Sequence, residues 1–169
     1  GESLMILMAD SLRIGLITGH IPVSVISQSN SAEGINNKVG ILHQTLVQDF
    51  AIRKPKIAIL GLNPHCGDNG LIGTEDEEII KPVIVKLQED GKLVYGPYAA
   101  DSFFGSGNYK NFDGVLAMYH DQGHIAIKLL AMHRAVNVTL GLPIVRTSVA
   151  HGTAFDVAWQ GRAETTGMV

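Results

Sequence analysis

Three histidines each follow a short apolar run of this sequence. They are His20, His65 and His120. If the apolar runs are parallel strands, the three imidazoles lie along one edge of a sheet, where open α/β sheets place their ligands. Neutral imidazoles are common ligands of divalent transition metals, so the set predicts a metal site. Because no short H-x-x-x-H pattern links them, ordinary hydrogen-bonded loop histidines are the alternative interpretation.

Three polar residues interrupt apolar segments further along the chain: Lys128, Asn137 and Arg146. A cation in apolar surroundings is costly without an anion, so Lys128 and Arg146 are candidates to bind a phosphate or a carboxylate. The alternative is a structural salt bridge, for which the candidate partners are Asp101, Asp113 and Asp121.

A cysteine nucleophile and a nucleotide-binding motif are weaker candidates for a functional site. Cys66 stands beside His65, but neighbouring loop residues rarely aim at each other and no strand-turn-helix elbow surrounds the cysteine, so we interpret Cys66 as a bystander. The sequence has neither a G-x-G-x-x-G fingerprint after a strand nor a P-loop. Structural or exposed roles are expected for the remaining loop and helix histidines, His43, His124 and His133.

Composition bounds the class of protein. The 169 residues are 46% apolar and carry a net charge of −3, which suits one globular domain and excludes a disordered chain or a disulfide miniprotein. Without a Lys/Arg stripe we expect no nucleic acid and no membrane surface as partner, but a small molecule or a protein. Cys66 is the single cysteine, so no internal disulfide forms and a cytoplasmic location is expected. No apolar run reaches the ~18 residues of a membrane span.

The hydrophobic pattern alternates between strands and helices. Strands are expected at 12–18, 56–62, 93–95, 114–119, 135–140 and 144–149. Helices are expected from a Ser31 cap to Phe50, from a capping box at Thr74 to Gly91 with a kink at Pro82, and at 125–132. The segments 63–73 and 105–111 are expected to be loops. This order predicts an α/β layered domain with a mixed, largely parallel sheet.

Longer motifs carry a family resemblance. They are LNPHCGDNGLIGTEDEEIIKP, GPYAADSFF, DGVLAMYHDQGHIAIKLLA, AVNVTLGLPIVRTSVAHGTAFDVA and, less sharply, ITGHIPV. Together they resemble the 4-hydroxythreonine-4-phosphate dehydrogenase (PdxA-type) family. The resemblance implies an isocitrate/isopropylmalate dehydrogenase-like fold, NAD as cofactor and a divalent metal, with Zn, Co, Ni, Mn and Mg all compatible. It also implies a homodimer whose metal ligands are shared across the interface.

The resemblance assigns roles by motif position. It implies that the metal ligands are His20, His65 and His120 and that the substrate is bound by Lys128, Asn137 and Arg146. Catalytic roles are implied for Lys128 and Asp121, the latter by orienting a metal ligand. By analogy with the fold class, NAD is expected to contact His151, Gly152, Thr153, Ala154 and Asp156.

The implied reaction is oxidation of a secondary alcohol to a β-keto acid that decarboxylates. The substrate is a phosphorylated four-carbon hydroxy acid, either 4-phosphooxy-L-threonine or, as YHDQGHIAIKLLA favours, 4-phospho-D-threonate or 4-phospho-D-erythronate.

The resemblance runs from about Leu12 to the end of the chain, and the sequence departs from the family pattern at Ala99, Ala150 and Arg162. Members of the family also carry a His-Thr pair in an N-terminal region, where it contacts the substrate. This sequence contains no such pair. We therefore expect residues 1–169 to be the C-terminal part of such an enzyme, without its N-terminal region and with little turnover alone. The alternative is a truncated, inactive metal-binding or subunit-interaction module.

Overall fold

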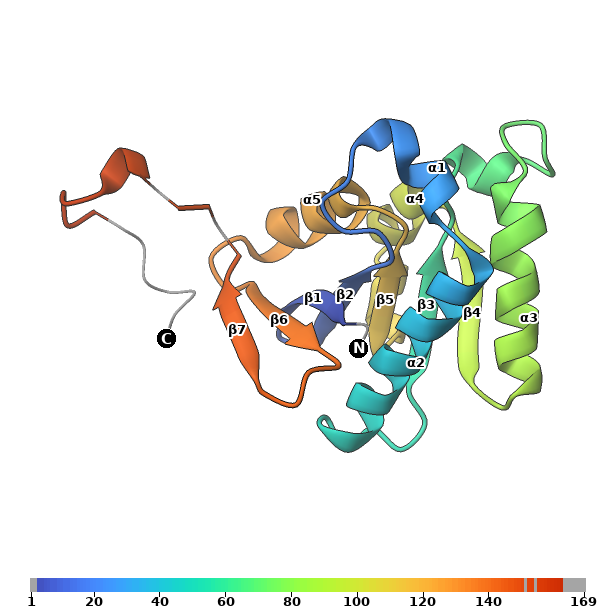
Figure 1. The fold of residues 1–169 in the computed structure, drawn as a ribbon, viewed down its shortest axis with the longest axis horizontal. Coiled ribbons are helices and arrows are strands. Elements are labelled where there is room, and N and C mark those ends of the chain that lie inside the picture. Colours follow the sequence, from blue (N-terminus) through green and yellow to red (C-terminus); the bar gives the residue numbers. More distant parts are fainter. Residues whose placement is uncertain (1–2, 151, 154, 163–169) are drawn as a thin grey trace.

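A mixed sheet forms the centre of the molecule (Figure 1). The computed structural model describes residues 3–150, 152–153 and 155–162. Within them the sheet has seven strands in the order β4-β3-β5-β2-β1-β6-β7. The strands are β1 (Leu4–Ala9), β2 (Leu12–Leu16), β3 (Lys56–Leu60), β4 (Leu93–Tyr98), β5 (Gly114–Ala117), β6 (Val136–Leu140) and β7 (Arg146–Val149).

The sheet has a parallel half and an antiparallel half. Strands β2, β5, β3 and β4 pair in parallel, whereas β1 pairs antiparallel with both β2 and β6, and β6 pairs antiparallel with β7. The predicted α/β class with a mixed sheet is confirmed. The antiparallel half is larger than expected because β1 was not among the expected strands.

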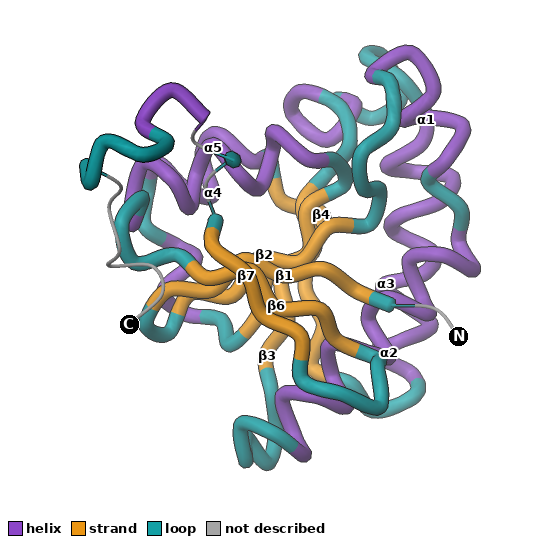
Figure 2. Tube along the Cα trace, turned by 60° about the vertical axis from the view of Figure 1, so that its left-hand side comes forward, coloured by secondary structure: helices purple, strands orange, loops and turns teal. Residues whose placement is uncertain are grey.

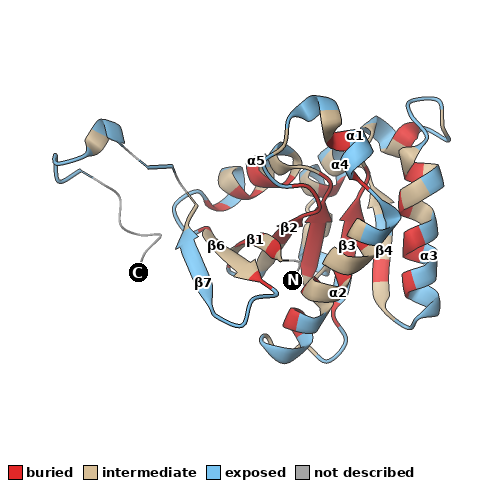
Figure 3. Cartoon of the chain, viewed as in Figure 1, coloured by how far each residue is buried: buried red, intermediate tan, exposed pale blue. Residues whose placement is uncertain are grey.

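Helices cover both faces of the sheet (Figure 2). On one face lie α2 (Ala32–Gln48) and α3 (Lys81–Glu89), and on the other α4 (Ala100–Gly105) and α5 (His120–Ala131). Within β3, Ile57 and Ile59 join the first core and Ala58 and Leu60 the second, as the period of two in a strand requires. The central strands β3 and β5 are thus buried on both faces, whereas β7 is exposed (Figure 3).

The remaining elements are short. They are the helical turns η1 (Val23–Val25), α1 (Ile26–Ser29), η2 (Pro64–Gly67), η3 (Asp76–Ile80), η4 (Asn108–Asn111) and η5 (Phe155–Val157). No helix in the described part of the chain is both long and apolar enough to cross a membrane.

The unexpected first strand has a simple physical reason. Residues Leu4–Ala9 read LMILMA, and Leu, Met and Ala have helical rather than strand propensity. Tertiary context overrides that propensity, because β1 inserts between β2 and β6 and buries Leu4 and Ile6 completely.

Three further elements differ from the expectation. The last helix begins at His120 rather than at residue 125, so its first turn contains the segment that looked like a loop. The helix α4 was not expected, and β4 extends to Tyr98. The other strands lie where expected, with ends that differ by a few residues.

Of the two predicted helix caps, one is confirmed. Ser31 Oγ accepts a hydrogen bond from the Gly34 N–H at 3.0 Å. The capping box at Thr74 is wrong: its hydroxyl instead donates to the Glu78 carboxylate at 3.0 Å. A π-helical turn, η3, precedes α3 and brings Pro82 into the first turn of α3, where a missing N–H costs little.

Candidate active site

His20 and His120 lie together at the carboxyl ends of β2 and β5. These strands are parallel, and the pairing continues past them, since the Ile17 N–H donates to the Ala117 carbonyl at 2.9 Å. The residues that follow the two strands therefore reach the same edge of the sheet. The two imidazole rings have their centroids 5.0 Å apart.

A chain of polar contacts runs from His120 into the protein. The Asp121 carboxylate lies 2.7 Å from His120 Nδ1, and His120 Nε2 lies 2.7 Å from His124 Nδ1. His124 is only 7% exposed. Burial, and next to it the neighbouring His120, lowers the pKa of His124 to about 4. His124 is therefore an uncharged imidazole at neutral pH.

Because α5 begins at His120, three of its polar residues share one face. His120, His124 and Lys128 are spaced by four residues and form a stripe along the helix. This stripe and His20 line a cavity of about 230 Å³, and Met5, Leu7 and Asn137 line it from β1 and β6. The predicted Lys128 and Asn137 are thus brought together with two of the predicted metal ligands.

Two polar atoms at this cavity have no hydrogen-bond partner among the described residues. They are His124 Nε2 and Asn137 Oδ1, and both are buried. The Asn137 amide group donates weakly to the sulfur of Met5, with Nδ2 and Sδ 3.4 Å apart. Sequence reasoning missed His124, because only the early start of α5 places it between His120 and Lys128.

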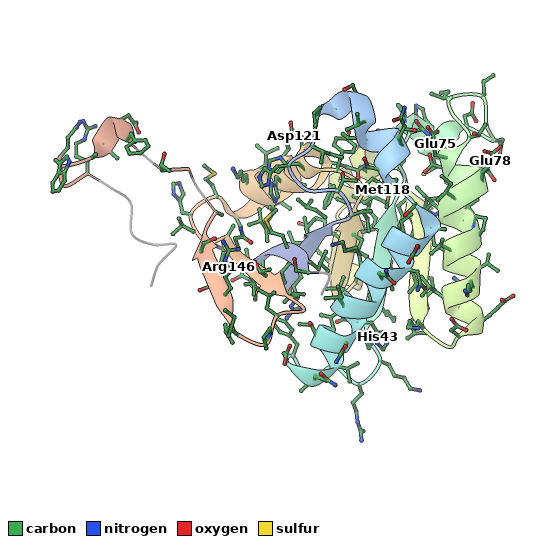
Figure 4. The ribbon with its side chains drawn as sticks, viewed as in Figure 1. His43, Glu75, Glu78, Met118, Asp121 and Arg146 are labelled. Carbon is green, nitrogen blue, oxygen red and sulfur yellow. The ribbon has the colours of Figure 1, made fainter. Side chains whose placement is uncertain are left out.

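Arg146 lies further out on the same face of the sheet. It stands opposite Thr139 in the β6/β7 ladder, and its Nη1 donates to Thr139 Oγ1 at 3.0 Å. Asn137 is two residues from Thr139 and therefore shares that face. Arg146 is exposed, and Figure 4 shows it well away from Asp121 at the start of α5.

The salt-bridge interpretation of the two cations is wrong within the described residues. The ion pairs found there involve neither Lys128 nor Arg146. Asp113 instead accepts a hydrogen bond from the Lys56 N–H at 2.8 Å, and Asp121 pairs with His120. Lys128, half-buried, keeps its charge available to a ligand of the cavity.

His65 lies apart from the other two predicted metal ligands. It lines a separate cavity of about 280 Å³, together with Asn63, Asp101 and Gln122. In the part of the chain that the structure describes, no three His, Cys, Asp or Glu side chains form a group that could hold a metal ion. One chain therefore brings together His20 and His120, and the three-histidine site stays a prediction.

The loop that carries His65 has an unusual backbone. His65 and Cys66 both have φ of 52°, and Asp68 has φ of 44°, in the left-handed region that non-glycine residues avoid. A buried carboxylate fixes the start of this loop. Asp76, fully buried, accepts hydrogen bonds from the Leu62 N–H at 2.9 Å and from the Asn63 N–H and side-chain amide at 3.0 Å each.

The sequence contained a signal for Asp76. It precedes Ile80, Val83 and Leu87 at helical spacing, which places a carboxylate on the apolar face of the helix. Next to it, Glu75 accepts from the Ser27 hydroxyl and from the Asn63 amide, the latter at 2.8 Å, and these hydrogen bonds, that from Ser27 above all, lower the pKa of Glu75. Glu75 and the exposed Glu78 lie on the same side of the molecule (Figure 4).

Gln122, which lines the cavity of His65, links two neighbouring strands of the sheet. Its Oε1 accepts from the Met118 N–H and its Nε2 donates to the Gly61 carbonyl, both at 2.7 Å. The amide thereby ties the end of β5 to the end of β3. This positioning role was also missed, because it depends on the same early start of α5.

The residues interpreted as bystanders are mostly remote from the cavity. Burial, and next to it Asp76, raises the pKa of the Cys66 thiol, which favours the unreactive thiol form. His43 is half-buried on α2, and His133 is exposed after α5.

The expected NAD residues are only partly described. His151 and Ala154 lie outside the described residues. Gly152 lines the 230 Å³ cavity, and Thr153 and Asp156 are exposed. Asp156 belongs to η5, which lies beyond β7, apart from the sheet, in Figure 1.

The chemistry of the donor set fits a divalent metal. A carboxylate on one nitrogen of a metal-binding histidine fixes the tautomer and leaves the other nitrogen for the cation. Asp121 makes this contact with His120 Nδ1, so Nε2 is the nitrogen available for coordination. That nitrogen contacts His124, and a cation bound at His120 would take the place of this hydrogen bond.

Comparison with known proteins identifies the family. A family model described as "Pyridoxal phosphate biosynthetic protein PdxA" matches residues 1–169. The chain belongs to the PdxA family. The 4-hydroxythreonine-4-phosphate dehydrogenase of Bacteroides thetaiotaomicron is 56% identical over 162 residues, which are 96% of this chain and 44% of that protein. Its counterpart from Acidithiobacillus ferrooxidans is 47% identical over 95% of this chain and 48% of its own length.

Solved structures of relatives share the fold. The 4-hydroxythreonine-4-phosphate dehydrogenase of Klebsiella pneumoniae matches 99% of this chain and 50% of its own, with a TM-score of 0.87 and 39% identity. A terephthalate 1,2-cis-dihydrodiol dehydrogenase from Burkholderia xenovorans matches 98% of this chain and 52% of its own, with a TM-score of 0.79 and 33% identity. The chain spans about half the length of the curated relatives it matches.

Proposed function

We propose that the chain is the C-terminal part of an NAD-dependent and divalent-metal-dependent dehydrogenase of the cytoplasm. Its substrate is a phosphorylated four-carbon hydroxy acid, 4-phosphooxy-L-threonine or 4-phospho-D-threonate or erythronate. The observation that carries the proposal is the cavity in which α5 presents His120 and Lys128 to His20 and Asn137, within a chain of the PdxA family.

Different residues in and beside the cavity bind different groups of the substrate. The Lys128 ammonium, which has no ion pair among the described residues, holds an anionic end of the substrate. Arg146 holds the other anionic end from the rim, and Asn137 fixes the register between them. Asp121 orients the His120 ring through the 2.7 Å contact to Nδ1.

The metal would be held by His20 and His120 of one subunit and His65 of a second. When bound, metal and NAD supply the Lewis acid and the hydride acceptor for oxidation of the secondary alcohol. The β-keto acid formed then loses CO₂. We propose that NAD contacts five residues that follow β7: His151, Gly152, Thr153, Ala154 and Asp156.

Exposed apolar side chains support a homodimer. Leu129 of α5 is 83% exposed, and Val145, next to β7, is 90% exposed. A large contiguous apolar patch, which we propose that these side chains help to form, marks an interaction surface. They lie on the α5 and β7 side of the molecule, which also bears the cavity.

The proposal is tested by NADH formation. The full-length protein, given NAD and each phosphorylated acid, should form NADH, lose activity on chelation and recover it with one or more of Zn, Co, Ni, Mn and Mg. Unphosphorylated threonine and threonate should react poorly, because they keep only the carboxylate and leave one of the two cations, Lys128 or Arg146, without an anion. The 169-residue chain alone should form little NADH. No NADH from any phosphorylated acid would contradict the proposed function.

A further inference from the structure

Two segments with proposed metal ligands meet at the carboxylate of Glu75, which is labelled in Figure 4. One oxygen, Oε1, accepts a hydrogen bond from the hydroxyl of Ser27, in the stretch of chain that follows His20. The other, Oε2, accepts at 2.8 Å from the side-chain amide of Asn63, in the loop that carries His65. The two oxygens of one side chain therefore connect the neighbourhoods of two histidines.

Glu75 supplies a directional tie for the stretch that follows His20. This stretch, residues 19–30, joins β2 to α2 and lines a cavity of about 400 Å³ with several residues, His20 among them. Apart from the bond to Glu75, the hydrogen bonds that its described residues make join partners inside the stretch. Burial of Ile26 packs the stretch onto the protein, and the contact of Ser27 with Glu75 fixes it sideways.

The other end of the link is firmly held. Asn63 also donates to Asp76, from its N–H and from its side-chain amide, at 3.0 Å each. Asp76 is fully buried and follows Glu75 in the chain, at the start of η3. Because hydrogen bonds to a charged carboxylate are stronger than those to a neutral acceptor, Asp76 fixes the position of Asn63. Glu75 extends this fixed point to α1.

We propose that Glu75 is a positioning residue for the metal ligands, because its carboxylate couples the stretch after His20 to the loop that carries His65. This inference rests on the proposed function, in which both histidines hold the metal. Groups that support metal ligands from outside raise metal affinity by fixing the ligands in place. Loss of the Glu75 carboxylate should therefore loosen both segments and weaken metal binding.

The first measurement is the Co²⁺ affinity of the full-length protein, from competition with a coloured chelator without substrate or NAD. Glu75→Ala should weaken Co²⁺ binding about 10-fold, the low end for groups that support metal ligands. Glu75→Gln should restore most of the affinity, because its amide accepts from Asn63 and donates to the Ser27 hydroxyl, which can also accept. The matched control is Glu89→Ala, at an exposed carboxylate at the end of α3, which should leave the affinity unchanged.

The second measurement, hydrogen exchange of the metal-free protein, separates a link from a local effect. Ser27→Ala should accelerate exchange mainly in residues 19–30, and Asn63→Ala mainly in residues 63–73. Glu75→Ala should accelerate exchange in both segments. In the Glu75→Ala background, adding Ser27→Ala should lower Co²⁺ affinity no further, since the two side chains make one hydrogen bond with each other.

Faster exchange of both segments with unchanged Co²⁺ affinity in Glu75→Ala would overturn the role, since Glu75 would then stabilise the segments without positioning a ligand. Weaker Co²⁺ binding with unchanged exchange, faster exchange in one segment alone, or equal losses in Glu75→Gln and Glu75→Ala would overturn it as well. A wild type that binds no Co²⁺ would instead remove the proposed metal site, and this inference with it.

Discussion

Asp76 is a buried carboxylate without a cationic partner among the described residues, and it holds the loop that carries His65. Its three accepted hydrogen bonds tie down Leu62 and Asn63, just before backbone of positive φ at His65. Hydrogen bonds from N–H groups stabilise a buried carboxylate in place of an opposite charge. The position of His65 therefore depends on a residue eleven places further along the chain, on η3.

Asp76→Asn should loosen this loop. One carboxylate oxygen becomes an NH₂ group that faces N–H donors, so we expect the free energy of unfolding to fall by about 2–3 kcal/mol. Hydrogen exchange at the Leu62 and Asn63 amides should accelerate as well. Glu78→Gln, at an exposed carboxylate of the same turn, is the control and should change neither. Unchanged exchange at both amides in Asp76→Asn would show that the carboxylate does not hold the loop.

At the scale of elements, the start of α5 decides the composition of the cavity. Gly123 lets this helix approach the sheet, because a Cβ there would lie 2.8 Å from Ile14 Cγ2 and 3.1 Å from Ala117 Cβ. The close approach brings the stripe of His120, His124 and Lys128 over β1 and β6. A helix that began at residue 125 would leave His120 and His124 in a loop.

Gly123→Ala should therefore destabilise the protein. We expect a loss of about 1–3 kcal/mol in urea unfolding, since the added methyl overpacks a closed interface. Gly40→Ala, on α2, is the matched control: nothing lies within 4 Å of its added Cβ. That substitution should stabilise by up to about 1 kcal/mol through helix propensity. Equal effects of the two substitutions would refute the close packing of α5.

Periodicity predicted the buried elements well and the site only in part. Two apolar runs predicted the buried strands β3 and β5, and a helix was predicted from the spacing of Ile35, Val39 and Leu42. These predictions are correct because the residue types themselves indicate which positions are buried. The strand β1 could not be predicted, since its residues favour helix and only pairing with β2 and β6 makes it a strand. His124 and Gln122 were missed because their roles require the exact helix start, which apolar spacing does not define.

At the scale of the whole molecule, the three proposed metal ligands do not lie together in one chain. His20 and His120 share a cavity, whereas His65 lines another, and the chain spans about half the length of the curated relatives it matches. Two apolar stretches near the cavity, at Leu129 and at Ile144 and Val145, are exposed. These observations are the basis for the proposal that a second subunit completes the site.

The most direct test of this account is a mixed dimer of the full-length protein, in which one subunit carries His65→Ala and the other His120→Ala. Each variant alone loses a ligand in both sites and should form little NADH. In the mixed dimer one site keeps His20 and His120 from one subunit and His65 from the other, so about half of the wild-type NADH formation should return. A mixed dimer as inactive as its two parents would contradict the shared site.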